Sequence, residues 1–272
     1  MTYRNSNSTF TAEELKARFN PEGSLKRRQQ LIMRDMVIEL DRICKKYDIP
    51  YFLSGGTLLG AMRHDGFIPW DDDLDVGLLR KDYLRLLKVL PSELPDHIAL
   101  QTNDTDKNFF FFYAKLRDRN SFLDEGDFDG AFRERGIFID IFPYDRLLPW
   151  TQRLRLQSMA YNIYRAGKGN ESALRKIRAL TWVNRHLCFP VLRFISRLSG
   201  VKNLMNDYGI PFHVVHDIKN IFPLTTHVFE GVELSVPGNS DGMLKEQYGD
   251  YMKLPDDMDN LYHHVEKLEI YD

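Results

Sequence analysis

The sequence predicts an α/β (α+β) fold in which helices flank a mixed β-sheet and a basic helical segment is inserted. In the first half of the chain, short apolar runs typical of strands alternate with apolar spacings of three and four residues, which are typical of helices. A long stretch after residue 150 is mostly helical. The chain has 272 residues and no internal repeat or low-complexity linker. We therefore expect one domain over 1–272, with a catalytic core over about 25–149 and 221–255 and an insertion over about 150–220.

The N-terminal part predicts two helices. Thr11 and Glu14 fit a capping box, and Asn20-Pro21 ends the short helix that follows. A longer helix is expected from about Leu25 to Tyr47 because apolar residues recur there at helical spacing.

The next elements are predicted from residue 51 onward. We expect a short strand at Tyr51–Leu53, a short helix at Thr57–Met62 after a glycine turn, and a strand at Trp70–Leu79. A helix should follow from Arg80 to Leu90, where Pro91 ends it.

The remaining elements follow the same reasoning. Phe109–Arg117 and Gly136–Phe142 are predicted strands, and the later helices should break near Gly167–Gly169 and near Pro190. A hairpin strand at Val228–Val236 and a helix ending at Tyr248 complete the prediction.

Composition argues against several classes of protein. The formal net charge of -2 does not suggest nucleic-acid binding. Cys44 and Cys188 are far apart and form no CxxC pair, so we expect no zinc site and a reducing compartment. The polar first ten residues do not resemble a signal peptide, and no uninterrupted apolar stretch reaches the length of a membrane span. We expect a cytoplasmic protein.

Charge is unevenly distributed. The segment from Thr151 to Asn206 holds eleven of the 37 Lys and Arg residues but only one of the 39 acidic residues, Glu171. Apolar residues lie among these cations, and an amphipathic basic helix can rest on an anionic membrane surface. The alternative is an insertion that packs on the core and leaves its basic face in water.

The first chemical motif is a glycine turn between the strand at residue 51 and the next helix. Gly55 and Gly56 let the backbone approach a ligand closely, and the N–H groups of the helix N-terminus favour an anion. Ser54 and Thr57 can add hydroxyl donors. Alone, such a turn is more often only a connection between a strand and a helix.

The second motif is a pair of carboxylates. On a strand, Asp73 and Asp75 face the same side, and Asp71 shares that side. Two carboxylates so placed repel each other unless a cation lies between them, and their oxygens suit Mg²⁺ or Mn²⁺. Asp140, a lone acid inside an apolar strand, is the candidate third carboxylate.

Together the two motifs predict a nucleotidyltransferase-type site. A phosphate-binding turn followed by a two-carboxylate strand suits two metal ions that bridge the attacking and leaving groups of an in-line displacement. Arg63 and His64, together with Lys115 and Arg117, are candidate contacts for donor phosphates. The alternatives for these four are a surface Arg, a turn His and a solvated strand face.

At this point the sequence resembles the LicD family, named for bacterial phosphocholine transferases and related to the fukutin-related transferases. The resemblance rests on Gly55–Gly60, Arg63-His64 and Ile68–Asp75. It continues more sparsely through the segments Tyr113–Asp118, the Asp140 strand, Tyr248–Met252 with Pro255, and weakly His263-His264.

The resemblance implies transfer of a phosphorylated small alcohol, most simply phosphocholine, from a CDP-alcohol to a hydroxyl of a cell-surface glycan or its lipid-linked precursor, with CMP leaving. It implies that Asp73 and Asp75 bind Mg²⁺ or Mn²⁺, that two ions are present, and that Asp140 completes the metal site. It also makes Asp140 the candidate that deprotonates the acceptor hydroxyl. It further implies the bacterial branch without the cysteine-rich zinc loop. Choline would call for aromatic faces, for which the candidates are Trp70, Phe128 and Tyr144. The alternatives are transfer of the nucleotide itself, another CDP-alcohol, or an inactive binding module.

Overall fold

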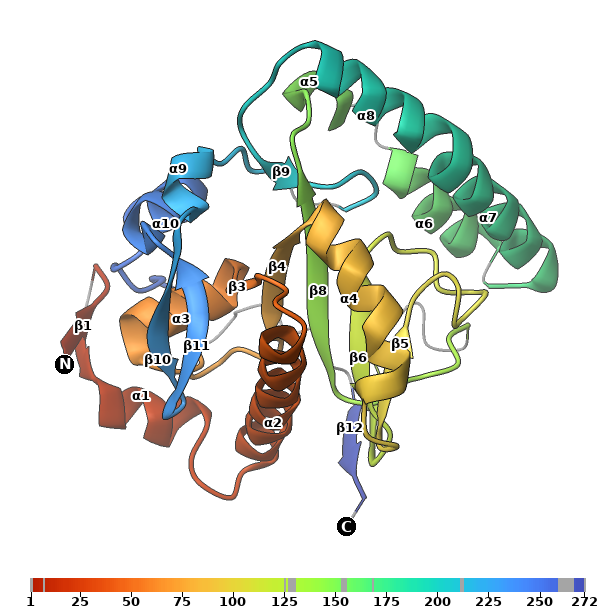
Figure 1. The fold of residues 1–272 in the computed structure, drawn as a ribbon. Helices are drawn as coiled ribbons and strands as arrows, with labels where there is room; N and C mark the ends of the chain where they lie inside the picture. The colour runs from red at the N-terminus through yellow and green to blue at the C-terminus, as the bar shows by residue number, and fades with distance from the viewer. Residues whose placement is uncertain are drawn as a thin grey trace.

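The computed structural model describes residues 2–6, 8–124, 126, 131–152, 156–167, 169–210, 213–258 and 267–271. Within these ranges the structure is a mixed α/β fold, as the sequence predicts (Figure 1). The strands are β1 (Thr2–Arg4), β2 (Thr9–Thr11), β3 (Phe52–Leu53), β4 (Asp75–Leu79), β5 (Ile98–Gln101), β6 (Ala114–Asp118), β7 (Ser121–Asp124), β8 (Phe138–Asp145), β9 (Met205–Asn206), β10 (Leu224–Phe229), β11 (Val232–Pro237) and β12 (Lys267–Ile270). The helices are α1 (Ala12–Phe19), α2 (Leu25–Lys46), α3 (Gly55–His64), α4 (Arg80–Glu93), α5 (Pro149–Gln152), α6 (Leu156–Gly167), α7 (Glu171–Val183), the π-helical turn η1 (Asn184–Cys188), α8 (Phe189–Leu198), α9 (Ile218–Ile221) and α10 (Ser240–Tyr248).

The central sheet has the strand order β3-β4-β8-β6-β5, and β9 pairs with the end of β8. Only the β4–β8 contact is parallel among the described pairs of this sheet, so the sheet is mixed. The long connection between β4 and β8 contains α4, β5 and β6, which agrees with the need of a parallel pair for a crossover. This topology brings residues 75 and 140 side by side although 65 positions separate them.

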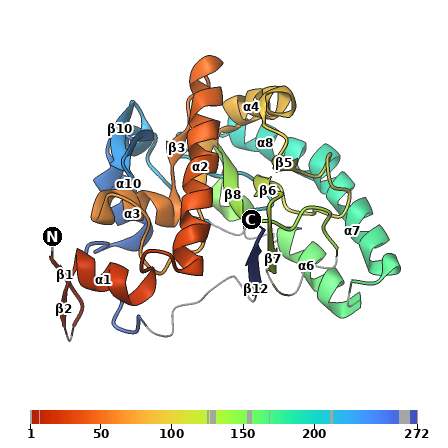
Figure 2. The same ribbon diagram turned by 90° about the horizontal axis from the view of Figure 1, so that it is seen from below.

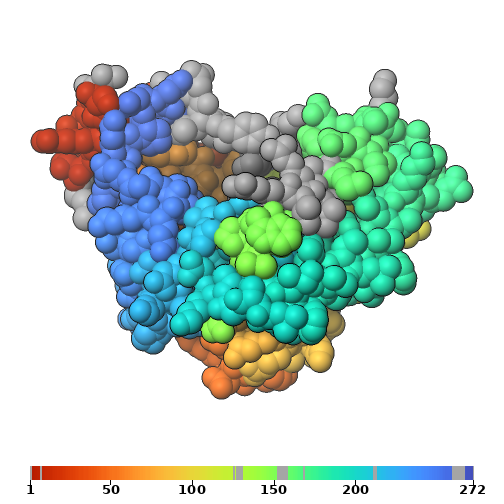
Figure 3. Space-filling model, turned by 90° about the horizontal axis from the view of Figure 1, so that it is seen from above, coloured from red at the N-terminus to blue at the C-terminus, as the bar shows by residue number. Residues whose placement is uncertain are grey.

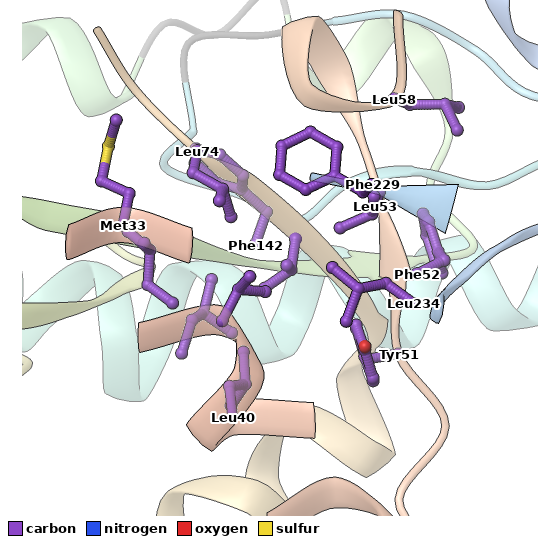
Figure 4. Close-up of a cluster of buried hydrophobic side chains, with 14 of the residues drawn as sticks. Met33, Leu40, Tyr51, Phe52, Leu53, Leu58, Leu74, Phe142, Phe229 and Leu234 are labelled. Carbon is purple, nitrogen blue, oxygen red and sulfur yellow. The ribbon is translucent and has the colours of Figure 1, made fainter. Parts of the chain in front are cut away.

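Helices α2 and α4 contact the central sheet and each other on one side of it (Figures 1 and 2). The capping box at Thr11 and Glu14 and the ends of α1 and α2 agree with the sequence prediction. The β10–β11 hairpin lies against α3 and β3, and α10 packs on α3. The largest core cluster fills the space between these elements, with side chains such as Met33, Leu40, Leu74, Phe142 and Phe229 (Figure 4).

Helices α6, α7 and α8, in the segment predicted to be an insertion, lie on the β6–β5 side of the sheet, away from the β10–β11 hairpin (Figures 1 and 2). Helices α6 and α7 cover a separate aromatic cluster that includes Phe109, Phe110 and Phe132. The predicted break at Gly167–Gly169 is present, but the predicted break at Pro190 is not. Pro190 is the second residue of α8, and the π-helical turn η1 joins α7 to α8 without a break at this position.

Several predicted elements differ in extent. Helix α4 continues past Pro91 to Glu93, and the hairpin strand predicted at Val228–Val236 is the pair β10 and β11. The strand predicted at Trp70–Leu79 begins only at Asp75, because the preceding loop is held by side chains of α2 and not by a neighbouring strand. The strand predicted at Phe109–Arg117 begins at Ala114, since the aromatic side chains before it form the cluster under α6 and α7. The helix predicted at Thr57–Met62 extends over Gly55–His64. None of the helices within the described ranges combines the length and the hydropathy that a membrane span requires.

Candidate active site

One row of polar residues crosses the central sheet. Asp75 on β4 is the register partner of Asp140 on β8, and Asp140 is the partner of Lys115 on β6. Register partners project from the same face of a sheet, so these three side chains point to the same side. At the β3 end of the row, the N–H of Ser54 donates to the carbonyl oxygen of Asp75 over 3.1 Å. The sheet therefore assembles two carboxylates and an ammonium group from three separate segments.

The glycines lie directly under the carboxylates. Gly55 has φ +56°, a left-handed conformation that favours glycine. A Cβ on Gly55 would lie 2.6 Å from Oδ2 of Asp75, and a Cβ on Gly56 would lie 3.0 Å from Oδ2 of Asp71. The hydroxyl of Thr57 accepts a hydrogen bond of 2.8 Å from the N–H of Asp75. The N-terminus of α3 is thereby fixed against the carboxylates, and its first turn offers N–H groups to an anion.

Asp71 and Asp73 join this cluster from the loop before β4. Burial raises the pKa of Asp75 well above its ordinary value, and the charges that add to this rise belong to Asp73, Asp140 and Asp71. Burial likewise raises the pKa of Asp71, followed by the charge of Asp73, to which Asp71 is also hydrogen-bonded. Four carboxylates thus lie close enough to repel one another, and a cation among them would relieve that repulsion.

Asp71 is the site residue that the sequence reasoning did not select. It shares the alternating spacing of Asp73 and Asp75, and this spacing was the available signal. The alternation does not come from a strand here, since β4 begins only at Asp75. The loop is instead extended by its contacts with α2.

Helix α2 holds the backbone of the acidic loop. Nε2 of Gln29 donates to the carbonyl of Asp72 over 2.9 Å, and Nε2 of Gln30 donates to the carbonyl of Asp71 over 3.1 Å. Nζ of Lys26 donates to the carbonyl of Trp70 over 3.0 Å. Since these side chains satisfy the carbonyl groups, the carboxylates remain available to a ligand.

Lys115 pairs with Asp140. The two charged atoms lie 3.2 Å apart, and the side chains are 4% and 10% exposed. The ammonium group also lies 3.1 Å from the centre of the Phe138 ring. The charge of Lys115 opposes the rise in the pKa of Asp75, so this one cation balances part of the acidic cluster.

Three predicted phosphate contacts have structural partners. Arg117 is 1% exposed and donates to Oε1 of Gln101 and to the carbonyl of Gly136. Arg63 is 3% exposed and donates to the carbonyl of Tyr251 and to Nε2 of His64. Burial lowers the pKa of His64 to about 3, with the charges of Arg63 and Lys16 adding to this effect. Their role as phosphate contacts stays a prediction.

Aromatic side chains surround the site. Tyr144, on β8, is hydrogen-bonded to Ser54 and Asn206, and burial raises its pKa to about 12. Burial also raises the pKa of Tyr248 on α10, and the nearby charges of Asp75 and other acidic side chains add to the rise. Trp70 is 8% exposed. Phe128 and His263-His264 lie outside the described residues, as do Arg153, Arg155 and Lys168 of the basic segment.

The donor atoms suit a hard divalent cation. All four carboxylates offer oxygen ligands, and Asp71, Asp73 and Asp75 are half-buried, so a ligand can reach them. Over the described ranges, no three His, Cys, Asp or Glu side chains are arranged as a ready metal cage. Mg²⁺ does not need such a cage, because one or two carboxylates together with water and substrate phosphates commonly hold it.

The glycine-started helix and the carboxylates on adjacent strands are typical of enzymes that transfer phosphate-linked groups. Comparison with known proteins agrees with this class. A family model described as "LicD/FKTN/FKRP, nucleotidyltransferase domain" matches residues 48–191. The chain belongs to the LicD family of transferases.

The chain is similar to individual members over different lengths. It is 30% identical over 266 residues to the lipopolysaccharide cholinephosphotransferase LicD of Haemophilus influenzae, covering 90% of this chain and 97% of that protein. It is 53% identical over 34 residues to the human ribitol 5-phosphate transferase FKRP, which is 12% of this chain and 7% of that protein. It is 33% identical over 85 residues to the mouse ribitol-5-phosphate transferase FKTN, with 26% and 18% covered.

Proposed function

We propose that this protein transfers phosphocholine from CDP-choline to a hydroxyl group of a cell-surface glycan or its lipid-linked precursor, and releases CMP. The single observation that carries the proposal is the cluster of Asp71, Asp73, Asp75 and Asp140 beside the glycine-started helix α3. The near full-length similarity to a lipopolysaccharide cholinephosphotransferase supports phosphocholine as the group moved. We place the reaction on the cytoplasmic side of the membrane.

We propose that Asp73 and Asp75 hold Mg²⁺ or Mn²⁺, as two ions when the donor is bound, and that Asp71 and Asp140 complete the site. Burial and then neighbouring carboxylates raise the pKa of Asp71 and of Asp75, and the short distances between these carboxylates support a cation at this position. Bound there, a divalent ion would neutralise charge on the donor phosphates and on the leaving CMP. No residue of the described chain is proposed for zinc.

The chain's own residues orient the donor. The N–H groups in the first turn of α3, at Gly55 and Gly56, would face the phosphates, and the buried hydroxyl groups of Ser54 and Thr57 would support this turn from behind. The side chain of Thr57 already fixes the backbone of Asp75. Lys115 adds a buried positive charge beside Asp140, on the side away from Asp75, and balances part of the acidic cluster next to the donor phosphates.

Asp140 is the proposed general base. The acceptor oxygen forms a bond to the phosphorus that carries choline, and the bond from this phosphorus to the bridging oxygen breaks. CMP leaves with the electron pair, and Asp140 takes the hydroxyl proton. The ion pair with Lys115, 3.2 Å long, holds the carboxylate of Asp140 on the face of the sheet that carries Asp75.

The test uses the purified protein, Mg²⁺, an accepting glycan extract and a panel of CDP-alcohols, with CMP release and label transfer as readouts. Release of CMP from CDP-choline, with the choline label appearing on the glycan, is the expected result. Release from another CDP-alcohol alone would change the substrate and keep the site. Nucleotide label on the acceptor would replace this proposal with nucleotidyl transfer.

A further inference from the structure

The helical insertion turns an apolar face to solvent. Helices α7 and α8, joined by η1, run from Glu171 to Leu198. A helix on a protein surface normally turns its apolar side inward. Here the inward positions are already filled, and the outward positions from residue 182 to 198 are apolar as well. These outward side chains, between 38% and 73% exposed, are Trp182, Val183, Leu187, Val191, Phe194, Ile195 and Leu198.

The spacing of these side chains makes one continuous stripe. They follow one another at steps of one, three and four residues, so they lie on one side of the helical run. At the usual helical rise, the stripe is about 24 Å long. The inward side carries Ala173, Leu174, Ile177, Thr181 and Phe189, which are buried. The stripe is therefore additional to the face that holds the insertion on the core. An exposed patch of this kind marks an interaction surface.

Positive charge borders the stripe at both ends. Arg175 and Lys176 precede it, Arg197 and Lys202 lie at its end, and all four side chains are exposed. The segment from 151 to 206 contains a single acidic residue, Glu171. The atoms of α8 lie at the surface in the view from above (Figure 3). The combination of Trp, Phe and Leu side chains with flanking cations is typical of helices that lie in a membrane interface.

A basic hollow adjoins the C-terminal end of α8. It has a volume of about 500 Å³ and is lined by Arg197 of α8, by Lys81 in the first turn of α4, and by Arg146, which directly follows β8. Asp145 is the acidic side chain in its lining, so the hollow has a net positive lining. Guanidinium groups favour phosphate oxygens, which would suit a lipid headgroup at the end of the apolar stripe.

We propose that the outward face of α7 and α8 docks on an anionic phospholipid surface. The apolar stripe would enter the boundary between headgroups and acyl chains, while the flanking cations contact lipid phosphates. The charge favours this occupant over a second copy of the chain, because a symmetric contact would bring the same basic segments together. Docking does not depend on the chemistry proposed for the carboxylates, but it would bring the active site to a lipid-linked acceptor.

The first test is flotation with vesicles of phosphatidylcholine, with and without phosphatidylglycerol. The wild-type protein should float with the anionic vesicles, and the Leu187→Ser/Val191→Ser/Phe194→Ser variant should not. The matched control is Leu25→Ser/Val228→Ser, which removes exposed apolar side chains elsewhere and should float normally. Arg175→Gln and Lys176→Gln should each weaken binding about fivefold. All these side chains are exposed, so thermal unfolding should stay unchanged.

The second test follows Trp182 in a Trp150→Phe background, in which the third tryptophan, Trp70, is 8% exposed. Anionic vesicles should shift its emission to the blue, and brominated lipids should quench it. Wild-type protein that stays unbound to anionic vesicles would overturn the proposal. The proposal would also be overturned if the triple-serine variant floated as well as the wild-type protein. The same holds if the wild-type protein self-associates without binding vesicles and the triple-serine variant loses that self-association. Neither readout requires catalysis, so failure here is distinguishable from failure of the proposed transfer reaction.

Discussion

A single glycine determines how closely Asp75 can approach helix α3. Gly55 has positive φ, and a Cβ at this position would lie only 2.6 Å from Oδ2 of Asp75. We predict that Gly55→Ala lowers the rate of CMP release roughly a hundredfold, because it displaces the carboxylate by a fraction of an ångström or more. Gly231→Ala is the matched control, since Gly231 also has positive φ but nothing within 4 Å. It should cost about 1–2 kcal/mol of stability and leave the rate unchanged. Equal rates in both variants would contradict the close approach.

The Lys115–Asp140 pair makes a prediction about stability. Both side chains are almost buried, so removing one partner strands a charge in the protein. Lys115→Met should lower the free energy of unfolding by about 3–5 kcal/mol, measured by urea denaturation. The double variant Lys115→Met/Asp140→Asn should be more stable than the sum of the single losses predicts. Additive losses would mean that the two groups are not coupled.

His64 links stability to pH. Its pKa is lowered from 6.5 to about 3, chiefly by burial. Between these values the unfolded chain binds a proton that the folded His64 does not, so stability falls as pH falls through this window. His64→Gln keeps an acceptor for Arg63 and cannot titrate. The stability of this variant should therefore fall less steeply with falling pH than that of the wild-type protein, and the two slopes should differ by up to about 1.4 kcal/mol per pH unit. The exposed His97→Gln should keep the wild-type slope. An unchanged slope in His64→Gln would show that His64 is not buried in its neutral form.

At the residue scale, the sequence identified most of the cluster and missed the rest for a definable reason. Asp73, Asp75 and Asp140 stand out because acids are rare in apolar strands, and the structure brings the three together. Lys26 could not be selected in this way, and Asp71 was not selected although its spacing matches that of Asp73 and Asp75. The contact of Lys26 with the acidic loop joins segments 44 residues apart, which no local pattern encodes. The charge of Asp71 matters only because the loop folds back over Gly56.

At the scale of elements, α2 is a scaffold for the acidic loop. Gln29 is 2% exposed and bonds the carbonyl of Asp72. Gln29→Ala should therefore cost about 1–2 kcal/mol of stability and lower the rate further than this loss explains. Asp35→Ala changes an exposed side chain of the same helix and should alter neither quantity. A rate loss in both variants would assign the effect to α2 as a whole and not to the loop contact.

Boundaries of elements were less predictable than their existence. Helices α1 and α2 follow from a cap and from periodicity, since these signals are local. The start of β4 could not be predicted from local signals, because side chains of α2 take the place of a strand partner for residues 70–72. Likewise, η1 carries the helix past the point where Pro190 alone predicted a break.

At the scale of the whole molecule, composition and pattern predict the mixed α/β class but not the order of strands. In the chain, α4, β5 and β6 lie between β4 and β8. The parallel pairing of β4 with β8 therefore depends on how these three elements pack, which is a property of the complete core. The division into a catalytic core and an insertion at about 150–220 stays a prediction. The outward-facing apolar stripe of α7 and α8 is flanked by basic residues. Its position shows why packing on the core and resting on a membrane surface need not exclude each other. One side packs on the core and the other side is left for a partner.

The carboxylates around α3 are proposed to form a metal-dependent transfer site. The measurement that tests this proposal most directly is the rate of CMP release from CDP-choline with Mg²⁺, for the wild-type protein, Asp73→Asn and the exposed Asp96→Asn. We predict that EDTA abolishes the wild-type rate, that Asp73→Asn lowers it roughly a thousandfold, and that Asp96→Asn leaves it unchanged. A rate that survives both EDTA and Asp73→Asn would contradict the account.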